Sequence, residues 1–392
     1  MPASPRETQK PDPAPSAAAG WILGRSARAS DVAELRTFGL TASERMRRAL
    51  ARAGCAPRRV DDDALPVLEP DERVAVLRAD RILDERLVRA LVAAPDTWLV
   101  HPTLGPLGAQ VAAQDAAVAV AALRGSGDPP AGLRRVAPDA LVPLWRADLR
   151  KAEPPWACAA NPEQADEIER RIFDASYKGV TDLITKWLWP RPARAATRWC
   201  AERGITPNAV TLFSWVLALA VIPLFAKGWF VPGLVLAWLM TFLDTVDGKL
   251  ARVTLTSSRI GDVLDHGLDL LHPPFWYLAW AYGLATPEPV ATAIVVAGYV
   301  VGRALEGVFL ARFGIEAHAW RPLDALFRTI TARRNPNLIL LSVGAVGGRP
   351  DLGLVMVALW TLVSLAFHTV RLAQAYAARR RGEPVTPLDE AR

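Results

Sequence analysis

The sequence predicts a chain of two parts, a soluble α/β domain followed by an all-α membrane domain of six transmembrane helices. The first observation is an uneven composition: charged residues are frequent up to about residue 205, and long runs of Leu, Val, Ala and Trp follow. The second is the length of those runs, because a helix needs roughly 20 mostly apolar residues to cross a bilayer. The third is the clustering of Arg and Lys beside the runs, which is typical of segments that meet anionic lipid.

Residues 19–165 have the pattern of an α/β domain, in which short apolar segments that could be buried strands alternate with helical periodicity. The expected strands include Trp21–Leu23, Val74–Leu77 and Thr97–Val100, and the expected helices include Ala42–Gly54 and Asp84–Ala94. Turn residues close the domain near residue 165.

The flanking stretches differ from this domain. Residues 1–18 are rich in Pro among small polar residues and predict a disordered tail. Residues 166–205 form a juxtamembrane stretch, and residues 164–189 predict an amphipathic helix with Trp187 at its membrane end. Such a helix suits the membrane interface, although packing on the soluble domain would also explain its apolar face.

The membrane domain, residues 206–378, precedes a basic and then polar tail at residues 379–392. Its apolar segments are approximately 208–226, 229–243, 260–285, 289–311, 336–348 and 352–373. Arg and Lys concentrate in alternate connections, so we expect both termini in the cytoplasm.

The composition also argues against several classes of protein. The net charge is +6, and Lys and Arg residues cluster beside the apolar runs. This placement favours membrane lipids rather than nucleic acid as a partner. Three widely spaced cysteines predict no disulfide framework. No internal repeat supports a transporter of the inverted-repeat type.

Four aspartates stand where the second apolar segment ends and the third begins, on the expected cytoplasmic side. Asp244 and Asp247 are three residues apart, and Asp265 and Asp269 are four apart, so each pair lies on one helical face. An antiparallel pair of helices would gather carboxylates whose charges repel strongly. Mg²⁺ removes that repulsion and prefers hard oxygen ligands that it shares with substrate phosphates. The aspartates therefore predict a metal site for a diphosphate.

Small residues and one cation accompany the aspartates. Gly248 and Ala251 share the face of the first pair and Gly261 that of Asp265, which leaves room for a nucleotide. Arg252 is suited to bidentate contact with phosphate.

This spacing resembles the signature of the CDP-alcohol phosphotransferase (phosphatidyltransferase) family, D-x-x-D-G-x-x-A-R, eight residues, then G-x-x-x-D-x-x-x-D. Every fixed position of the signature is present between Asp244 and Asp269. Residues 206–211 resemble the family's segment that opens the first membrane helix, and the resemblance covers about residues 165–380.

The resemblance implies an integral-membrane enzyme of phospholipid or polar-headgroup biosynthesis. It would move a phospho-alcohol group from a CDP-alcohol, such as CDP-diacylglycerol, to an acceptor hydroxyl and release CMP. Asp244 and Asp265 would bridge two Mg²⁺ ions, with Mn²⁺ as an alternative metal. Asp247 would complete the shell of one ion, and Asp269 would ligate the other and act as general base. The residues assigned to CDP-alcohol binding are Asn208, Thr211, Gly248, Ala251, Arg252, Ser258 and Gly261. A homodimer is also implied.

Basic residues further along the chain are candidates for the acceptor site. Arg303, three residues before Glu306, either holds an acceptor headgroup or is neutralised by that carboxylate. Arg328, Arg333 and Arg334 either reflect topology and anionic lipid or grip an acidic acceptor.

The N-terminal domain resembles fragments of a sugar-nucleotide-type cytidylyltransferase at residues 40–54 and 76–84. The Gly-rich G-x-G-x-R loop of such enzymes is not evident near Gly20–Arg25, and Arg78 and Arg81 flank the candidate metal ligand Asp80. We therefore interpret the domain as degenerate. The alternatives are a bifunctional enzyme with a soluble CDP-polyol donor of inositol-phosphate type, an intramembrane prenyltransferase, and a membrane scaffold.

Overall fold

The structure is a computed structural model, and it describes residues 19–24, 35–61 and 65–388. The predicted disordered tail, residues 1–18, therefore lies outside the described residues. In helix α9 the backbone is described but these side chains are not: Arg259, Ile260, Asp262, Leu264, Asp265, His266, Leu268 and Asp269.

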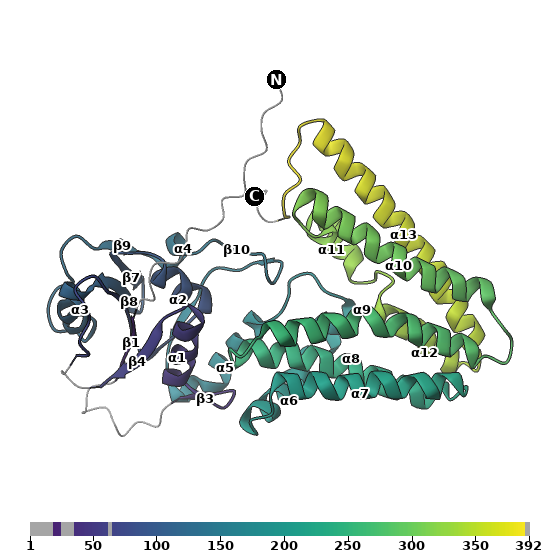
Figure 1. Ribbon diagram of the computed structural model, residues 1–392, viewed down its shortest axis with the longest axis horizontal. Helices are drawn as coiled ribbons and strands as arrows, with labels where there is room; N and C mark the ends of the chain where they lie inside the picture. The colour runs from purple at the N-terminus through teal and green to yellow at the C-terminus, as the bar shows by residue number, and fades with distance from the viewer. Residues whose placement is uncertain (1–18, 25–34, 62–64, 389–392) are drawn as a thin grey trace. The chain divides into compact units, whose positions relative to one another are not determined.

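The chain divides into two compact units (Figure 1). One comprises the residues up to Leu144 together with Glu153–Glu169, and the other comprises Trp145–Ala152 and the residues from Arg170 onward.

The first unit is built on a mixed six-stranded sheet. Its strands, in spatial order, are β4 (Ala56–Val60), β1 (Ala19–Leu23), β5 (Arg73–Arg78), β8 (Gly105–Ala112), β7 (Thr97–His101) and β9 (Arg134–Val136). β1 is parallel to β4 and β5, β8 is antiparallel to β5 and β7, and β9 is parallel to β7. Short strands pair beside this sheet: β2 (Arg36–Thr37) with β3 (Leu40–Thr41), and β6 (Arg81–Leu83) with β12 (Ala157–Ala159).

Helices bury the middle of this sheet. They are α1 (Ala42–Arg52), α2 (Glu85–Val92), α3 (Ala116–Leu123) and α4 (Pro138–Leu141). Residues 74–77 of β5 are fully buried, as expected for a central strand that is apolar on both faces. Val74 and Val76 pack with Val120 and Leu123 of α3. The α/β character, the three named strands and both named helices are thus confirmed.

The helix predicted over residues 164–189 is interrupted. The chain leaves α5 (Ala165–Ala175), runs without helix through residues 176–182, and resumes in a π-helical turn, Ile184–Leu188. The cause is Asp182, whose side chain accepts from the backbone N–H groups of Ile184 and Thr185 and so starts a new helical segment. The prediction of one continuous helix was therefore wrong.

The second unit is helical. It contains the end of α5, the hairpin strands β10 (Trp145–Arg146) and β11 (Lys151–Ala152), and then α6 (Pro190–Glu202), α7 (Pro207–Ala226), α8 (Phe230–Val253), α9 (Arg259–Tyr282), α10 (Pro289–Phe313), α11 (Pro322–Arg328), α12 (Arg334–Val346) and α13 (Pro350–Arg380). Among the described residues, α7, α8, α10 and α13 are long and apolar enough to cross a membrane. Helix α12 has 13 residues and begins in the polar stretch before the fifth apolar segment.

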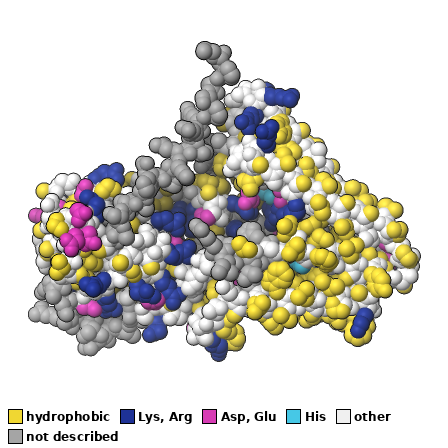
Figure 2. Space-filling view, in the orientation of Figure 1, with side chains coloured by type: hydrophobic (Ala, Val, Ile, Leu, Met, Phe, Trp, Pro, Cys, Tyr) yellow, Lys and Arg dark blue, Asp and Glu magenta, His cyan; other side chains and the backbone are white. Residues whose placement is uncertain are grey.

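The helices pack around an aromatic core. α7 packs against α8 and α9, α10 packs against α9 and α13, and α12 packs against α8 and α13 (Figure 1). Phe225 of α7 meets Trp276 and Trp280 of α9 edge to face, with ring centroids 6.3 Å and 4.9 Å away. Figure 2 shows hydrophobic side chains gathered over the outer surface of the long helices, as expected for faces that meet lipid.

Two glycines allow α12 and α13 to approach closely. A Cβ added at Gly344 would lie 2.5 Å from the Cα of Gly353. This distance is shorter than any normal carbon–carbon contact, and the obstructing atom is backbone, so only a shift of a whole helix could relieve it.

We predict that Gly344→Ala lowers the stability of the membrane domain by about 1–3 kcal/mol through this overpacking. Thermal unfolding of purified protein in detergent, followed by Trp fluorescence, measures the effect. The matched control is Gly307→Ala in α10, where an added Cβ meets nothing within 4 Å and the melting temperature should hold or rise. Equal melting temperatures for the two variants would contradict the close approach.

Candidate active site

The first two aspartates lie on helix α8. It extends to Val253, ten residues past the end of the apolar segment at 243, so Asp244 and Asp247 both lie in one continuous helix. The chain then turns, and α9 begins with the Ser258 Oγ accepting from the Gly261 N–H at 3.1 Å.

Asp247 joins α8 to the first turns of α7. Its side chain is 3 % exposed, and its Oδ2 accepts from the Thr211 Oγ1 at 2.6 Å. Thr206, which caps α7 by accepting from the Ala209 N–H, fixes where that helix starts. The Thr211 hydroxyl thus binds one oxygen of the buried Asp247 carboxylate.

Asp244 is held by a cation instead. Arg334, the first residue of α12, donates through Nη1 to Oδ1 at 3.2 Å and through Nη2 to Oδ2 at 2.5 Å. The two side chains are 17 % and 13 % exposed. This bidentate pair joins α8 to α12 and is the strong form of a charge-assisted contact.

Several of the residues predicted to bind the CDP-alcohol lie close to one another. The Asn208 Oδ1 would be 3.0 Å from a Cβ added at Gly261, so the starts of α7 and α9 are adjacent there. The guanidinium of Arg252 lies 3.1 Å from the position of a Cβ at Gly248. Ala251 is half-buried between them on α8.

Asp265 and Asp269 lie on α9, which is continuous through both positions. Their side chains lie outside the described residues, so whether they meet Asp244 and Asp247 stays a prediction.

The four candidate acceptor arginines line one pocket. Its empty volume is about 490 Å³, and its wall is formed by Asp182, Pro273, Tyr299, Arg303, Arg328, Arg333, Arg334, Asn335 and Pro336. The Nε and Nη1 of Arg328 are shielded from solvent and have no hydrogen-bond partner in the described part of the chain. Burial and the neighbouring Arg333 lower the pKa of Arg328 to about 9. Buried donors of this kind call for an anion.

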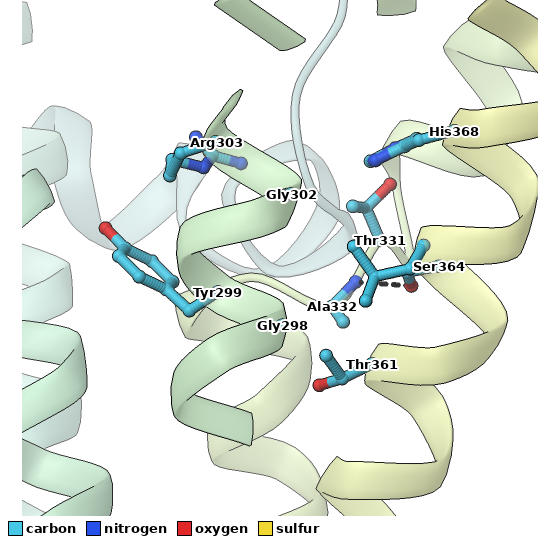
Figure 3. Close-up of a pocket in the computed structure, with 10 residues that line it drawn as sticks. Gly298, Tyr299, Gly302, Arg303, Thr331, Ala332, Thr361, Ser364 and His368 are labelled. Atoms are coloured by element: carbon cyan, nitrogen blue, oxygen red, sulfur yellow. Dashed lines mark hydrogen bonds between the residues drawn. The ribbon is translucent and has the colours of Figure 1, made fainter. Parts of the chain in front are cut away.

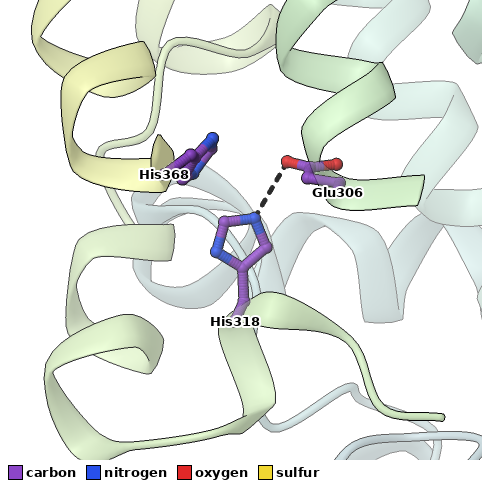
Figure 4. Close-up of side chains that lie close together, drawn as sticks. All are labelled: Glu306, His318 and His368. Atoms are coloured by element: carbon purple, nitrogen blue, oxygen red, sulfur yellow. Dashed lines mark hydrogen bonds and ion pairs between the residues drawn. The ribbon is translucent and has the colours of Figure 1, made fainter. Parts of the chain in front are cut away.

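Glu306 of α10 binds two of these arginines, and Figure 4 shows it beside His318 and His368. Its Oε1 accepts from Arg303 at 2.8 Å and lies 3.0 Å from the Nε2 of His318, and its Oε2 accepts from Arg333. Arg303 and Glu306, the pair left open by the sequence, are therefore ion-paired, yet Arg303 also faces the pocket.

Glu306, His318 and His368 also form a group of metal-ligand type, with ligand atoms within 4.8 Å of one another. The surrounding charge argues against a cation there. One carboxylate already faces two guanidinium groups, so a divalent ion would enter a strongly positive environment. We interpret Glu306 as the residue that positions Arg303 and Arg333.

A second groove lies between α10 and α13 (Figure 3). Tyr299 and Arg303 of α10 line both spaces, and His368 lines the far end of the groove. The Ser364 Oγ accepts from the Ala332 N–H at 3.0 Å, which closes the floor.

Two further residues near this pocket could not be predicted from local sequence patterns. Asp182 is buried, which opposes its ionisation, but bonds from Asn335 and the Thr185 backbone and the charge of Arg328 hold its pKa below the usual range. Arg150, in the β10–β11 turn with φ of +51°, forms an ion pair with Glu316. Arg150 lies far up the chain, so no local spacing could connect it to this site.

Comparison with known proteins finds the same family that the spacing of the four aspartates resembles. Residues 204–376 match the family model for CDP-alcohol phosphatidyltransferase. A cholinephosphotransferase 1 of Gallus gallus is 30 % identical over 137 residues, covering 31 % of this chain and 38 % of the relative. The chain thus spans well under half of that protein.

Two other similar proteins are matched over most of their own length. An archaetidylinositol phosphate synthase of Pyrococcus horikoshii is 24 % identical over 194 residues, which are 49 % of this chain and 94 % of that protein. A crystal structure of the Mycobacterium tuberculosis phosphatidylinositol phosphate synthase with CDP-DAG bound is 21 % identical, covers 46 % of this chain and 94 % of that one, and gives a TM-score of 0.38.

Burial lowers the pKa of His318 from its ordinary 6.5 to about 3, against the opposing hydrogen bond to Glu306. The imidazole is thus neutral when folded and takes a proton on unfolding, so stability falls as the pH drops below about 6.5. We predict a loss of about 2 kcal/mol between pH 7 and pH 5 from this residue alone. Thermal unfolding of His318→Gln should lose less stability over that interval than wild type. If the stability of wild type and His318→Gln fell equally between pH 7 and pH 5, His318 would not be a buried neutral histidine.

Proposed function

We propose that the membrane domain, whose residues 204–376 belong to the CDP-alcohol phosphatidyltransferase family, transfers a phospho-alcohol group from a CDP-alcohol to an acceptor hydroxyl and releases CMP. The observation that carries the proposal is the pair of carboxylates on α8, Asp244 and Asp247, beside a pocket lined by four arginines. CDP-diacylglycerol is the donor we propose.

The residues fit a pair of Mg²⁺ ions, or Mn²⁺. Asp244 already binds a cationic group through both of its oxygens, and Asp247 presents a buried carboxylate three residues away. With Asp265 and Asp269 on α9 the donor set consists of hard oxygens, which these ions prefer. When bound, the ions would neutralise negative charge that grows on the phosphate oxygens during transfer.

The protein's own groups would do the rest. The acceptor oxygen forms a bond to the phosphorus that carries the donor's alcohol, the bond from that phosphorus to CMP breaks, and the acceptor's proton passes to the carboxylate of Asp269. The residues that would hold the CDP-alcohol are Asn208, Thr211, Gly248, Ala251, Arg252, Ser258 and Gly261.

The acceptor should carry a phosphate of its own. Arg328 has buried N–H groups with no acceptor in the described part of the chain, and a phosphate would satisfy them. The name of the archaeal relative, an archaetidylinositol phosphate synthase, supports a phosphorylated polyol.

The N-terminal unit is proposed to be degenerate. Asp80, the candidate metal ligand, lies 2.8 Å from both Arg78 and Arg81, so its charge is already neutralised. An active cytidylyltransferase supplying a soluble CDP-polyol is the alternative, and formation of a CDP-alcohol from CTP by the isolated domain would establish it.

The remaining assignments concern the membrane. We propose six spanning helices with both termini in the cytoplasm, and a homodimer. The exposed Trp187 and Trp199, with Lys186 and Arg203 beside their rings, support an interfacial position for residues 184–203.

Asp269→Asn should separate chemistry from binding. The amide cannot take the proton, so CMP release should slow by roughly 10²–10⁴-fold. Donor affinity should stay within about tenfold of wild type, ~1.4 kcal/mol. Asp244→Asn should lose donor affinity and turnover together, and excess chelator should abolish turnover in wild type.

Calorimetric titration beside a CMP-release assay makes the comparison. Near-normal turnover in Asp269→Asn, or donor affinity as poor as in Asp244→Asn, would remove Asp269 from the role of base. Full activity in chelator would refute the metal requirement.

A further inference from the structure

Arg334 stands between the two sites described above. Its guanidinium binds both oxygens of Asp244, and the same side chain forms part of the wall of the arginine pocket. Its partner on α8 is a carboxylate of the proposed metal site, whereas the described carboxylate partner of Arg303 and Arg333 is Glu306.

A divalent cation and this guanidinium compete for the same atoms. Metal ions held by Asp244 would bind its carboxylate oxygens, and both oxygens are engaged by N–H groups of Arg334 at 3.2 Å and 2.5 Å. The two cations would also repel each other at contact distance in a site that is largely shielded from water. Metal ligation by Asp244 therefore weakens its contacts with Arg334 and favours release of the guanidinium.

The released group has a polar destination within reach. Its side chain already borders the pocket, whose wall contains the carboxylate of Asp182 and the side chain of Asn335. The turned side chain would thus add positive charge to a space that already holds three arginines.

Building on the proposed function, we propose that Arg334 couples the two sites: a divalent cation on Asp244 moves the guanidinium into the pocket, where it binds the phosphate of the acceptor. An anion in the pocket would in turn draw Arg334 away from Asp244 and make room for the metal. Each ligand then strengthens the binding of the other by the same factor, as thermodynamic linkage requires. The acceptor would be held most tightly only when the metal that serves the chemistry is present.

The test measures binding and not turnover. Mn²⁺ binding to the purified full-length protein is followed by electron paramagnetic resonance, with and without inorganic phosphate, and phosphate binding by calorimetry, with and without Mn²⁺. A protein-free titration corrects for Mn²⁺ bound by phosphate in solution. For wild type we expect phosphate to lower the Kd for Mn²⁺ by about tenfold, and Mn²⁺ to lower the Kd for phosphate equally.

Two variants assign the coupling to Arg334. Arg334→Gln removes the competing cation, so it should bind Mn²⁺ more tightly than wild type, bind phosphate more weakly, and show a coupling factor near one. Arg303→Gln is the matched control, since it lines the same pocket but binds Glu306. It should weaken phosphate binding and leave Mn²⁺ affinity without phosphate unchanged.

The outcomes separate this inference from the proposed function. Independent binding of Mn²⁺ and phosphate in wild type, or weaker Mn²⁺ binding in Arg334→Gln, would overturn the coupling and leave the transferase assignment intact. No Mn²⁺ binding in wild type would overturn both. If Arg334→Gln does not fold, Arg334→Lys replaces it; Lys cannot donate bidentately, so its coupling factor should fall below the wild-type value, and an unchanged factor would contradict the proposal.

Discussion

A carboxylate at membrane depth must be matched by a cation or by hydrogen-bond donors, and this constraint organises the membrane domain. Asp244 is matched by Arg334, Asp247 by Thr211, and Glu306 by Arg303 and Arg333. Nearly every match joins two different segments: α8 with α12, α8 with α7, and α10 with the residue before α12. A buried pair between Asp324 of α11 and Arg371 of α13, at 2.5 Å, follows the same rule. The carboxylates proposed to serve the chemistry therefore also form contacts that hold the surrounding helices together.

The arginine pocket shows the converse of this rule. Glu306 binds both Arg303 and Arg333, and Arg328 places buried N–H groups where the described residues offer no acceptor. Leaving a buried charge unmatched is expensive, so such an excess of positive charge suits a site that an anion occupies during function. The hairpin turn at Arg150 adds a further cation, held by Glu316, from a part of the chain that precedes the family domain.

Local spacing was enough to predict much of this. Intervals of three and four residues place Asp244 with Asp247 and Asp265 with Asp269, and the structure keeps each pair within one continuous helix. The partners could not be predicted, because Thr211 lies 36 residues from Asp247 and Arg334 lies 90 from Asp244. The mistaken helix over residues 164–189 has a related cause. Asp182 fits the polar face of an amphipathic helix, whereas its carboxylate in fact caps the next segment and binds Asn335, 153 residues away.

The proposed reaction transfers a phospho-alcohol group to a phosphorylated acceptor. The most direct measurement is mass spectrometry of the products formed by the purified full-length protein from CDP-diacylglycerol, Mg²⁺ and matched alcohols, such as glycerol and inositol with and without a phosphate. The account predicts a new phosphatidyl product, formed in equal amount with CMP, from a phosphorylated alcohol and not from its uncharged counterpart. Products from the uncharged alcohols in preference, or no product with any acceptor, would contradict it.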